Sequence, residues 1–323
     1  MLAHLMLRIV LVILALIAIA GLTLPWLLVR PASLDQLPER PFADSHRLDV
    51  AGVNLHYRWR DGAADRPGVV LIHGFSGSAF SWRKTMDALE QRGLAVLAPD
   101  LPPFGYSDKR PVDAPWAELV TALIASRMSE RELILIGHSM GARVVTELAH
   151  QHQDRTSQLI LVAGTPGAGP RGGGMVNWLA AQPTAARWAE LIGAGRVVNR
   201  ERIAEALASA YGQEPDEPAI EGYLQPLMIP GTISSLLLRI STTRSARLER
   251  PDLPISLIWG ERDSWVPIGG AHELVRRWPQ ARLHLMPGLG HNPMETDPEA
   301  FMAILDSVLG IDPAAADTMD DGG

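Results

Sequence analysis

Leu133-Ile134-Leu135-Ile136-Gly137-His138-Ser139-Met140-Gly141-Ala142-Arg143 is the stretch of sequence that decides the fold. Its first five residues form an apolar run as long as one buried strand. Residues 137–141 fit the pattern G-x-S-x-G, and residues 142–151 have the composition of a helix. A strand, a tight turn and a helix in this order predict a serine in a strained turn, with its hydroxyl exposed at the sheet edge. The flanking glycines are expected because strand and helix pass too closely for larger side chains. Ser139 is therefore the predicted nucleophile.

The predicted nucleophile needs a histidine base, and the base needs an acid that orients it. In a sheet of this kind the acid and the base follow the serine in that order, each after a later strand. The strand expected at 255–259 leads into Asp263, and the strand expected at 282–286 leads into His291. Both residues should therefore lie on loops at the carboxyl edge of the sheet, where open α/β sheets bind ligands.

Two neighbouring residues compete with these assignments. Glu261 is the rival acid, but it stands at the end of its strand, whereas Asp263 is two residues into the loop. His138 adjoins the serine, and its backbone direction is expected to point its ring away from the site. The predicted catalytic residues are thus Ser139, Asp263 and His291, and the chemistry requires no metal and no organic cofactor.

An oxyanion that develops on a substrate carbonyl needs two preorganised N–H donors. The first is expected from the backbone of Met140, directly after the nucleophile. The second is expected from Phe75, in the glycine-containing turn 73–78 that follows the strand at 68–72. His73 is expected to shape this turn. A phosphate-binding loop is the weaker interpretation, because the pattern G-x-x-x-x-G-K is absent.

Strands and helices alternate along most of the chain, which predicts an α/β fold whose mostly parallel sheet is flanked by helices. The expected strands are 46–50, 55–60, 68–72, 94–98, 133–137, 159–163, 255–259 and 282–286. Residues 165–250 contain helical patches (176–181, 185–192, 200–211 and 233–242) and no good strand, so they are expected to form a helical cap. The predicted organisation is a transmembrane signal anchor at 1–30, a linker at 31–44, core at 45–165, cap at 166–250, core at 251–310 and a disordered acidic tail at 311–323.

The first thirty residues differ in kind from the rest. Arg8 and Arg30 bracket 21 apolar or small residues, enough to cross ~30 Å of hydrocarbon at ~1.5 Å per residue. A cleaved signal peptide is the alternative, because Ala18-Ile19-Ala20 resembles a cleavage site. The apolar run continues past that site to Val29, which favours a retained anchor. We expect a single-pass protein of a bacterial inner membrane, with its catalytic domain outside the cytoplasm.

Composition excludes several kinds of function. The net charge of −7 indicates no basic surface for nucleic acid. The chain has no cysteine, which rules out disulfides, thiolate metal sites and thiol nucleophiles.

From about Ser45 to Gly310 the chain resembles an α/β-hydrolase. The resemblance rests on five motifs in family order, at 73–78, 99–108, 137–141, 259–267 and 290–293. With the N-terminal span, the chain is most similar to membrane-anchored monoacylglycerol-lipase-type esterases. It is also similar to carbon–carbon bond hydrolases and to the magnesium-chelatase-associated hydrolase-like protein. The haloalkane dehalogenase branch carries aspartate at the position of Ser139, so the resemblance disfavours dehalogenation and epoxide hydrolysis.

This resemblance implies a serine hydrolase that cleaves a carboxylic ester through an acyl-enzyme on Ser139. The membrane tether and the apolar side chains of the cap favour a lipophilic small molecule as the substrate; these side chains are Trp178, Leu179, Trp188, Leu191, Ile192, Leu224, Leu227, Met228 and Ile229. Two alternatives stay open. One is a carbon–carbon bond hydrolase or cofactor-free perhydrolase with the same triad, and the other is a hydrolase-like accessory or binding protein, such as the magnesium-chelatase-associated type. The sequence does not indicate an oligomeric state.

Overall fold

The computed structural model describes residues 2–30, 32–167, 182–196, 198–242 and 248–311. Within them, eight strands form one sheet in the order β1-β2-β4-β3-β5-β6-β7-β8. Strand β2 is antiparallel to both of its neighbours, and the pairs from β4 through β8 are parallel. The strands are β1 Ser45–Val50, β2 Val53–Arg60, β3 Gly68–Ile72, β4 Ala95–Pro99, β5 Leu133–His138, β6 Thr156–Val162, β7 Ile255–Gly260 and β8 Arg282–Met286. The prediction of a mostly parallel sheet is confirmed, with strand ends shifted by at most three residues.

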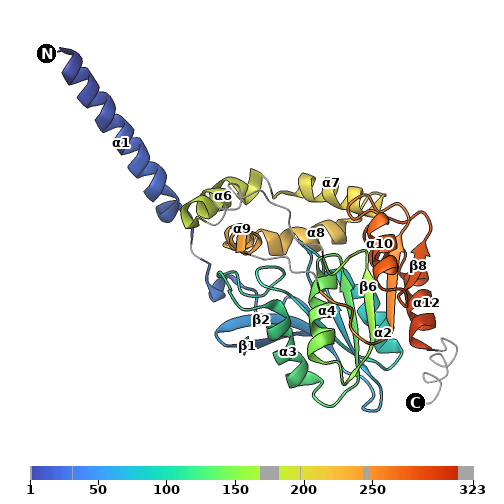
Figure 1. Cartoon of the computed structure of the whole chain (residues 1–323). Coiled ribbons are helices and arrows are strands. Elements are labelled where there is room, and N and C mark those ends of the chain that lie inside the picture. Colours follow the sequence, from blue (N-terminus) through green and yellow to red (C-terminus); the bar gives the residue numbers. More distant parts are fainter. Residues whose placement is uncertain (1, 31, 168–181, 197, 243–247, 312–323) are drawn as a thin grey trace.

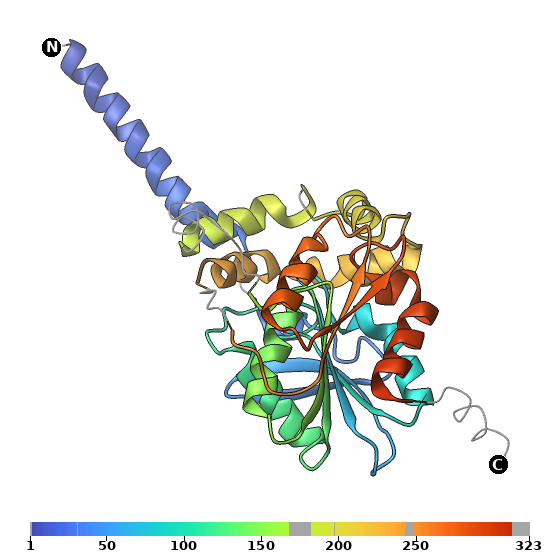
Figure 2. The same ribbon diagram turned by 45° about the vertical axis from the view of Figure 1, so that its right-hand side comes forward.

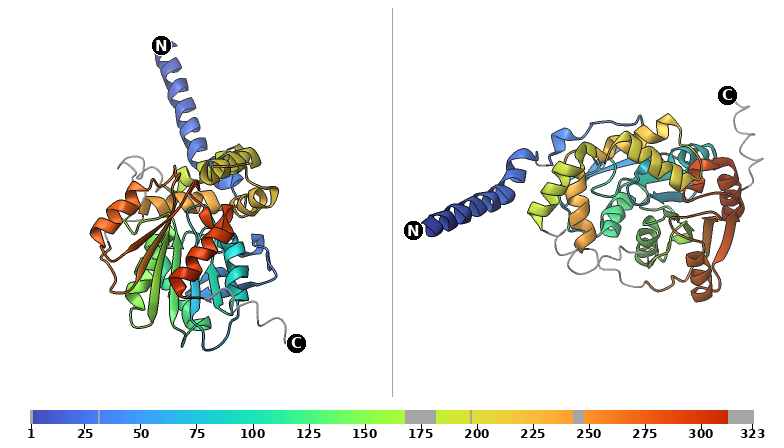
Figure 3. Two further views of the ribbon diagram at one scale, coloured as in Figure 1. Left: turned by 90° about the vertical axis from the view of Figure 1, so that its right-hand side faces the viewer. Right: turned by 90° about the horizontal axis from the view of Figure 1, so that it is seen from above.

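Helices cover both faces of the sheet because its central strands are apolar on both sides. Every residue of β3, β4, β5 and β7 is buried. The helices α3, α4 and α10 lie on one face, and α2 and α12 lie on the other (Figure 3). Their bounds are α2 Arg83–Gln91, α3 Trp116–Arg127, α4 Gly141–Gln151, α10 Gly269–Arg277 and α12 Pro298–Leu309. Three short helices complete the body: η1 Leu34–Gln36, η2 Ala79–Trp82 and α11 Pro293–Thr296.

A layer of helices lies between β6 and β7 in the chain and covers one end of the sheet (Figure 1). It consists of α6 Pro183–Arg196, α7 Arg200–Tyr211, α8 Glu217–Leu227 and α9 Thr232–Thr242. This agrees with the expected helical cap, although the residue limits of the cap stay a prediction. The helical patch expected at 176–181 and the acidic tail from 312 onwards lie outside the described residues.

Helix α8 is an element that the sequence patterns did not predict. Its two prolines suggest a helix breaker, but Pro218 stands in the first turn, where a free N–H is not needed. Asp216 caps this end by accepting a hydrogen bond from the backbone N–H of Ala219. A Cβ atom at Gly222 would lie 2.3 Å from the ring of Phe80. Glycine therefore allows α8 to approach the core closely at this point.

The N-terminal helix α1 runs from Leu2 to Leu28 and leaves the body at the cap (Figures 1 and 2). Its segment His4–Leu28 is long and apolar enough to cross a membrane. A signal sequence near the N-terminus can have the same length and apolar composition.

Candidate active site

Ser139 stands in a sharp turn between β5 and α4, at φ 51°. A residue other than glycine is strained in this left-handed region, as expected for a nucleophile elbow. The surrounding glycines are sterically required. A Cβ atom at Gly137 would lie 2.5 Å from the carbonyl oxygen of Gly141, and one at Gly141 would lie 2.5 Å from that of Ile72. The tight packing holds Ser139 half-buried at the carboxyl end of β5.

The predicted acid and base are in direct contact. The Nδ1 atom of His291 lies 2.8 Å from Oδ2 of Asp263, and both side chains are buried. The other carboxylate oxygen of Asp263 accepts hydrogen bonds from the backbone N–H groups of Trp265 and Val266, each at 2.9 Å. These contacts fix the carboxylate, and the carboxylate fixes the imidazole ring.

The rival acid Glu261 has another partner. Its Oε2 atom accepts a hydrogen bond of 3.2 Å from the backbone N–H of Gly288, in the turn after β8. Asp263 is therefore the carboxylate that the loop brings to His291.

His138 does not point away from the site, so that expectation is wrong. Its Nε2 atom lies 2.9 Å from the carbonyl oxygen of His291, and the two ring centroids are 4.7 Å apart. Burial is the main reason that the pKa of His138 lies well below its ordinary value, and the neighbouring His291 lowers it further. A neutral His138 can donate its Nε2–H to the His291 carbonyl. The reason for the error is that β5 ends beside the loop that follows β8, a contact that only the folded chain creates.

Replacing His138 by leucine is expected to lower kcat ~10–100-fold with little change in KM, since a buried carbonyl would lose a hydrogen bond worth ~1–3 kcal/mol. The glutamine variant keeps an N–H donor and should recover most of this loss. Steady-state kinetics and melting temperatures of both variants would measure the effect. Full kcat in His138→Leu would show that the contact does not position His291.

The turn after β3 supplies the second predicted oxyanion donor. A Cβ atom at Gly74 would lie 3.1 Å from Cβ of Ser139, so the turn passes directly beside the serine. In the described part of the chain, the backbone N–H groups of Phe75 and Met140 donate to no protein acceptor. These two donors are thus left available to a substrate oxygen.

Buried side chains hold this turn in place. His73 Nδ1 donates to the carbonyl of Gly74 at 2.7 Å, and its Nε2 accepts from the N–H of Leu101 at 2.9 Å. This pairing requires a neutral ring, and burial lowers the pKa of His73 accordingly. The expectation that His73 shapes the turn agrees with these contacts.

Asp100 is a buried polar centre whose role the sequence did not reveal. Its carboxylate accepts hydrogen bonds from the N–H groups of Ala79 at 2.7 Å and Tyr106 at 2.6 Å, and it contacts His56 Nδ1 at 2.7 Å. Burial would raise the pKa of Asp100, but its interactions with His56, together with His73 and the backbone N–H of Ala79, outweigh burial and lower the pKa to about 2. A charged Asp100, in the loop after β4, therefore joins this loop to β2 and to η2, which follows the turn after β3.

The cap is hydrogen-bonded to the catalytic loops. The backbone N–H of His291 donates to the carbonyl of Ala210 at the end of α7, at 2.6 Å. The indole N–H of Trp265 donates to Ser209 Oγ at 3.1 Å, and its ring stacks on His291 at a centroid distance of 5.6 Å. The position of His291 therefore depends on the cap as well as on the core.

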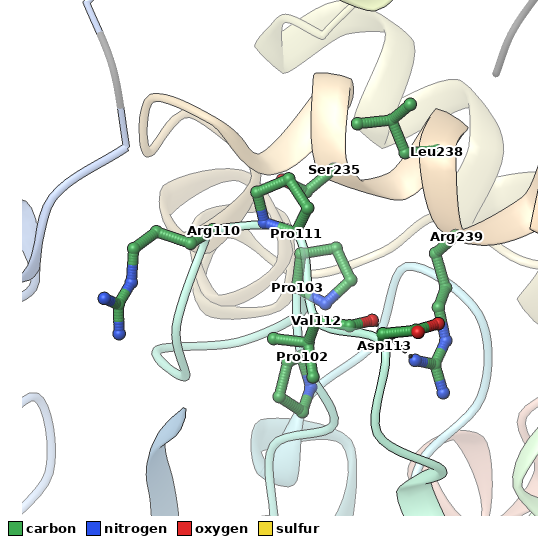
Figure 4. Close-up of a pocket in the computed structure, with 9 residues that line it drawn as sticks. All are labelled: Pro102, Pro103, Arg110, Pro111, Val112, Asp113, Ser235, Leu238 and Arg239. Carbon is green, nitrogen blue, oxygen red and sulfur yellow. Dashed lines mark hydrogen bonds between the residues drawn. The ribbon is translucent and has the colours of Figure 1, made fainter. Parts of the chain in front are cut away.

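A cavity of about 200 Å³ lies between the loop after β4 and helix α9 (Figure 4). Prolines 102, 103 and 111 form much of its wall. The guanidinium of Arg239 donates to the carbonyls of Val112 and Ala114 at its edge. Among the described residues that line it, none is a predicted catalytic or oxyanion residue. The cavity therefore lies at the interface between cap and core.

Comparison with known proteins agrees with this architecture. A family model described as "Alpha/beta hydrolase family" matches residues 69–304. A pimeloyl-[acyl-carrier protein] methyl ester esterase of Nitrosomonas europaea is 28% identical over 249 residues, which cover 75% of this chain and 95% of the esterase.

Two solved structures share the fold at low identity. An esterase from Thermogutta terrifontis matches with a TM-score of 0.65 and 22% identity, over 83% of this chain and 99% of its own. A membrane phospholipase A, described as a bacterial virulence factor, matches with a TM-score of 0.62 and 24% identity, over 95% of this chain and 99% of its own.

Proposed function

The chain belongs to the alpha/beta hydrolase family, and we propose that it is a membrane-anchored serine esterase that hydrolyses a carboxylic ester of a lipophilic small molecule. The contact of 2.8 Å between His291 and Asp263 carries this proposal. This hydrogen bond occupies Nδ1 of the His291 ring, so Nε2 is the nitrogen that can take a proton from Ser139.

In the proposed reaction, His291 removes the proton of Ser139 as the serine oxygen attacks the ester carbonyl. The N–H groups of Phe75 and Met140 stabilise the oxyanion of the tetrahedral intermediate. His291 then gives its proton to the leaving alcohol, and an acyl-enzyme remains on the serine. A water molecule, deprotonated by the same histidine, releases the acid and restores the enzyme. Asp263 stabilises the imidazolium that forms in each half of the reaction.

An ester substrate is supported by the esterase relative and by the serine at the elbow, which can form an acyl-enzyme. A lipophilic substrate is supported by the apolar helix α1, which would hold the enzyme beside lipids. Retention of α1 is supported by its apolar run, which continues past the possible cleavage site at 18–20 to Val29. A location in the bacterial inner membrane, with the catalytic domain outside the cytoplasm, completes the proposal.

Labelling by a fluorophosphonate tests the proposed nucleophile. The full-length protein in detergent should be labelled at one serine, and peptide mass spectrometry should identify it as Ser139. A folded protein that is not labelled would contradict the esterase proposal and favour a binding role.

A series of p-nitrophenyl esters tests the proposed substrate class. We expect kcat/KM to rise up to about fourfold per added methylene until the acyl site is full, because burying one CH₂ is worth ~0.8 kcal/mol. A kcat/KM that falls steadily from the acetate onwards would contradict a lipophilic substrate. Cleavage of carbon–carbon ring-fission products without ester hydrolysis would indicate the other reaction class.

A further inference from the structure

One backbone hydrogen bond of helix α1 is missing between Gly21 and Pro25, and we call this site the notch. Pro25 has no N–H, so the carbonyl oxygen of Gly21, four residues earlier, loses its donor within the helix. The indole N–H of Trp188 in α6 donates to this oxygen at 2.8 Å. A side chain of the cap thus satisfies the carbonyl that the proline leaves unpaired.

Further contacts join the last two turns of α1 to α6. The indole N–H of Trp26 donates to Thr184 at 3.2 Å. The guanidinium of Arg187 lies 4.1 Å from the centre of the Trp26 ring and donates to the carbonyl of Val29 at 3.3 Å. The two helices meet at the end of the cap from which α1 leaves (Figures 1 and 2).

Burial along α1 follows the same face. Pro25 is buried, and Gly21 and Val29 are partly buried, at a spacing of four residues. The residues from His4 to Ala20 are exposed throughout. Among the described residues, the contacts of α1 are therefore concentrated in its last turns, and the exposed turns from His4 to Ala20 could contact lipid.

The contacts between α1 and α6 limit how deep α6 can lie in a membrane, if α1 crosses that membrane as proposed above. Arg187 is costly in hydrocarbon, whereas arginine and tryptophan together are typical of the headgroup layer. Leu2–Gly21 contains 20 residues, enough for ~30 Å of hydrocarbon. Arg8 would then lie about 9 Å from the far boundary, at ~1.5 Å per residue, within reach of a snorkelling side chain. On this argument the membrane-crossing residues are Leu2–Gly21, closer to the N-terminus than the span of 9–29 expected from the sequence.

We propose that the notch at Gly21 and Pro25 is the docking site of the cap on the membrane anchor, and that α6 lies in the headgroup layer of the bilayer. The partner surface is a phospholipid interface. Thr184 and Trp188 face α1, and Ile192, one turn further along α6, is 48% exposed. Its apolar side chain would face the lipid.

Single-cysteine spin labelling tests this depth, because the chain has no cysteine of its own. The full-length variants Ile192→Cys and Glu130→Cys are labelled with a nitroxide and reconstituted into phosphatidylcholine–phosphatidylglycerol vesicles. Glu130 is exposed in the loop before β5 and serves as the control far from the cap. At position 192 we expect the label to collide more with oxygen than with a water-soluble nickel chelate, and at position 130 the reverse.

Protein that floats with the vesicles but shows equal water exposure at both positions would overturn the proposed depth of α6. Protein that does not float would overturn the anchor and the depth together. Neither measurement uses ester turnover, so failure of the esterase proposal would be recognised separately.

A double-mutant cycle tests the notch itself. Trp188→Phe should increase the mobility of the label at 192, because the Gly21 carbonyl loses its donor. Pro25→Ala restores a backbone N–H at position 25, so Trp188→Phe should have a much smaller effect in that background. An equal effect in both backgrounds would show that Trp188 acts by packing alone and would overturn the docking role of the notch.

Discussion

Ser139→Ala is expected to reduce ester turnover by on the order of 10⁶-fold in kcat, as removal of a triad serine does in other hydrolases. The hydroxyl is the proposed nucleophile, so the alanine variant cannot form the acyl-enzyme at this position. Alanine has the same backbone preference as serine at φ 51°, so the melting temperature should not change. Kinetics on the best p-nitrophenyl ester, together with thermal unfolding, would measure both quantities.

Ser264→Ala is the matched control for this variant. Ser264 is exposed on the loop that carries Asp263, and its loss should leave kcat and fluorophosphonate labelling unchanged. Residual turnover of Ser139→Ala above one per cent, in protein free of wild type, would mean that the reaction does not pass through an acyl-serine.

Asp263→Asn is expected to lower kcat by on the order of 10⁴-fold, with the fold retained. The amide oxygen can still accept from the N–H groups of Trp265 and Val266. The amide nitrogen would then face Nδ1 of His291 as a donor, which favours the wrong tautomer of the ring. The imidazolium of the transition state would also lose its negative partner.

Glu261→Gln provides the comparison on the same loop. Its amide oxygen can keep the hydrogen bond from Gly288, and the residue does not contact His291, so kcat should stay within about twofold of the wild type. A loss in Glu261→Gln as large as that in Asp263→Asn would reassign the acid.

Hydrogen bonds of the cap connect it both to the catalytic loop and to helix α1. The cap contacts the catalytic loop through Ala210 and helix α1 through Trp188. Tyr223 of α8 adds a third attachment by donating to Glu295 at 2.6 Å.

The sequence by itself determined the elements whose signals are local. The apolar run before Ser139, the two glycines around it and the loops that carry Asp263 and His291 follow from strand length, turn sterics and the order of elements. The strand and the turn depend on neighbouring residues, and the acid and base loops on the order of elements along the chain, so the linear sequence is enough to predict them.

Tertiary structure decided the features that join distant segments. His138 contacts the backbone of His291 because β5 and the loop after β8 meet at one edge of the sheet. Helix α8 packs closely against the core because Gly222 has no side chain where it meets the ring of Phe80. The Gly21 carbonyl, left unpaired by Pro25, is satisfied by Trp188, which lies 167 residues further along the chain. In each case the stabilising partner is remote in sequence, and no local propensity encodes its approach.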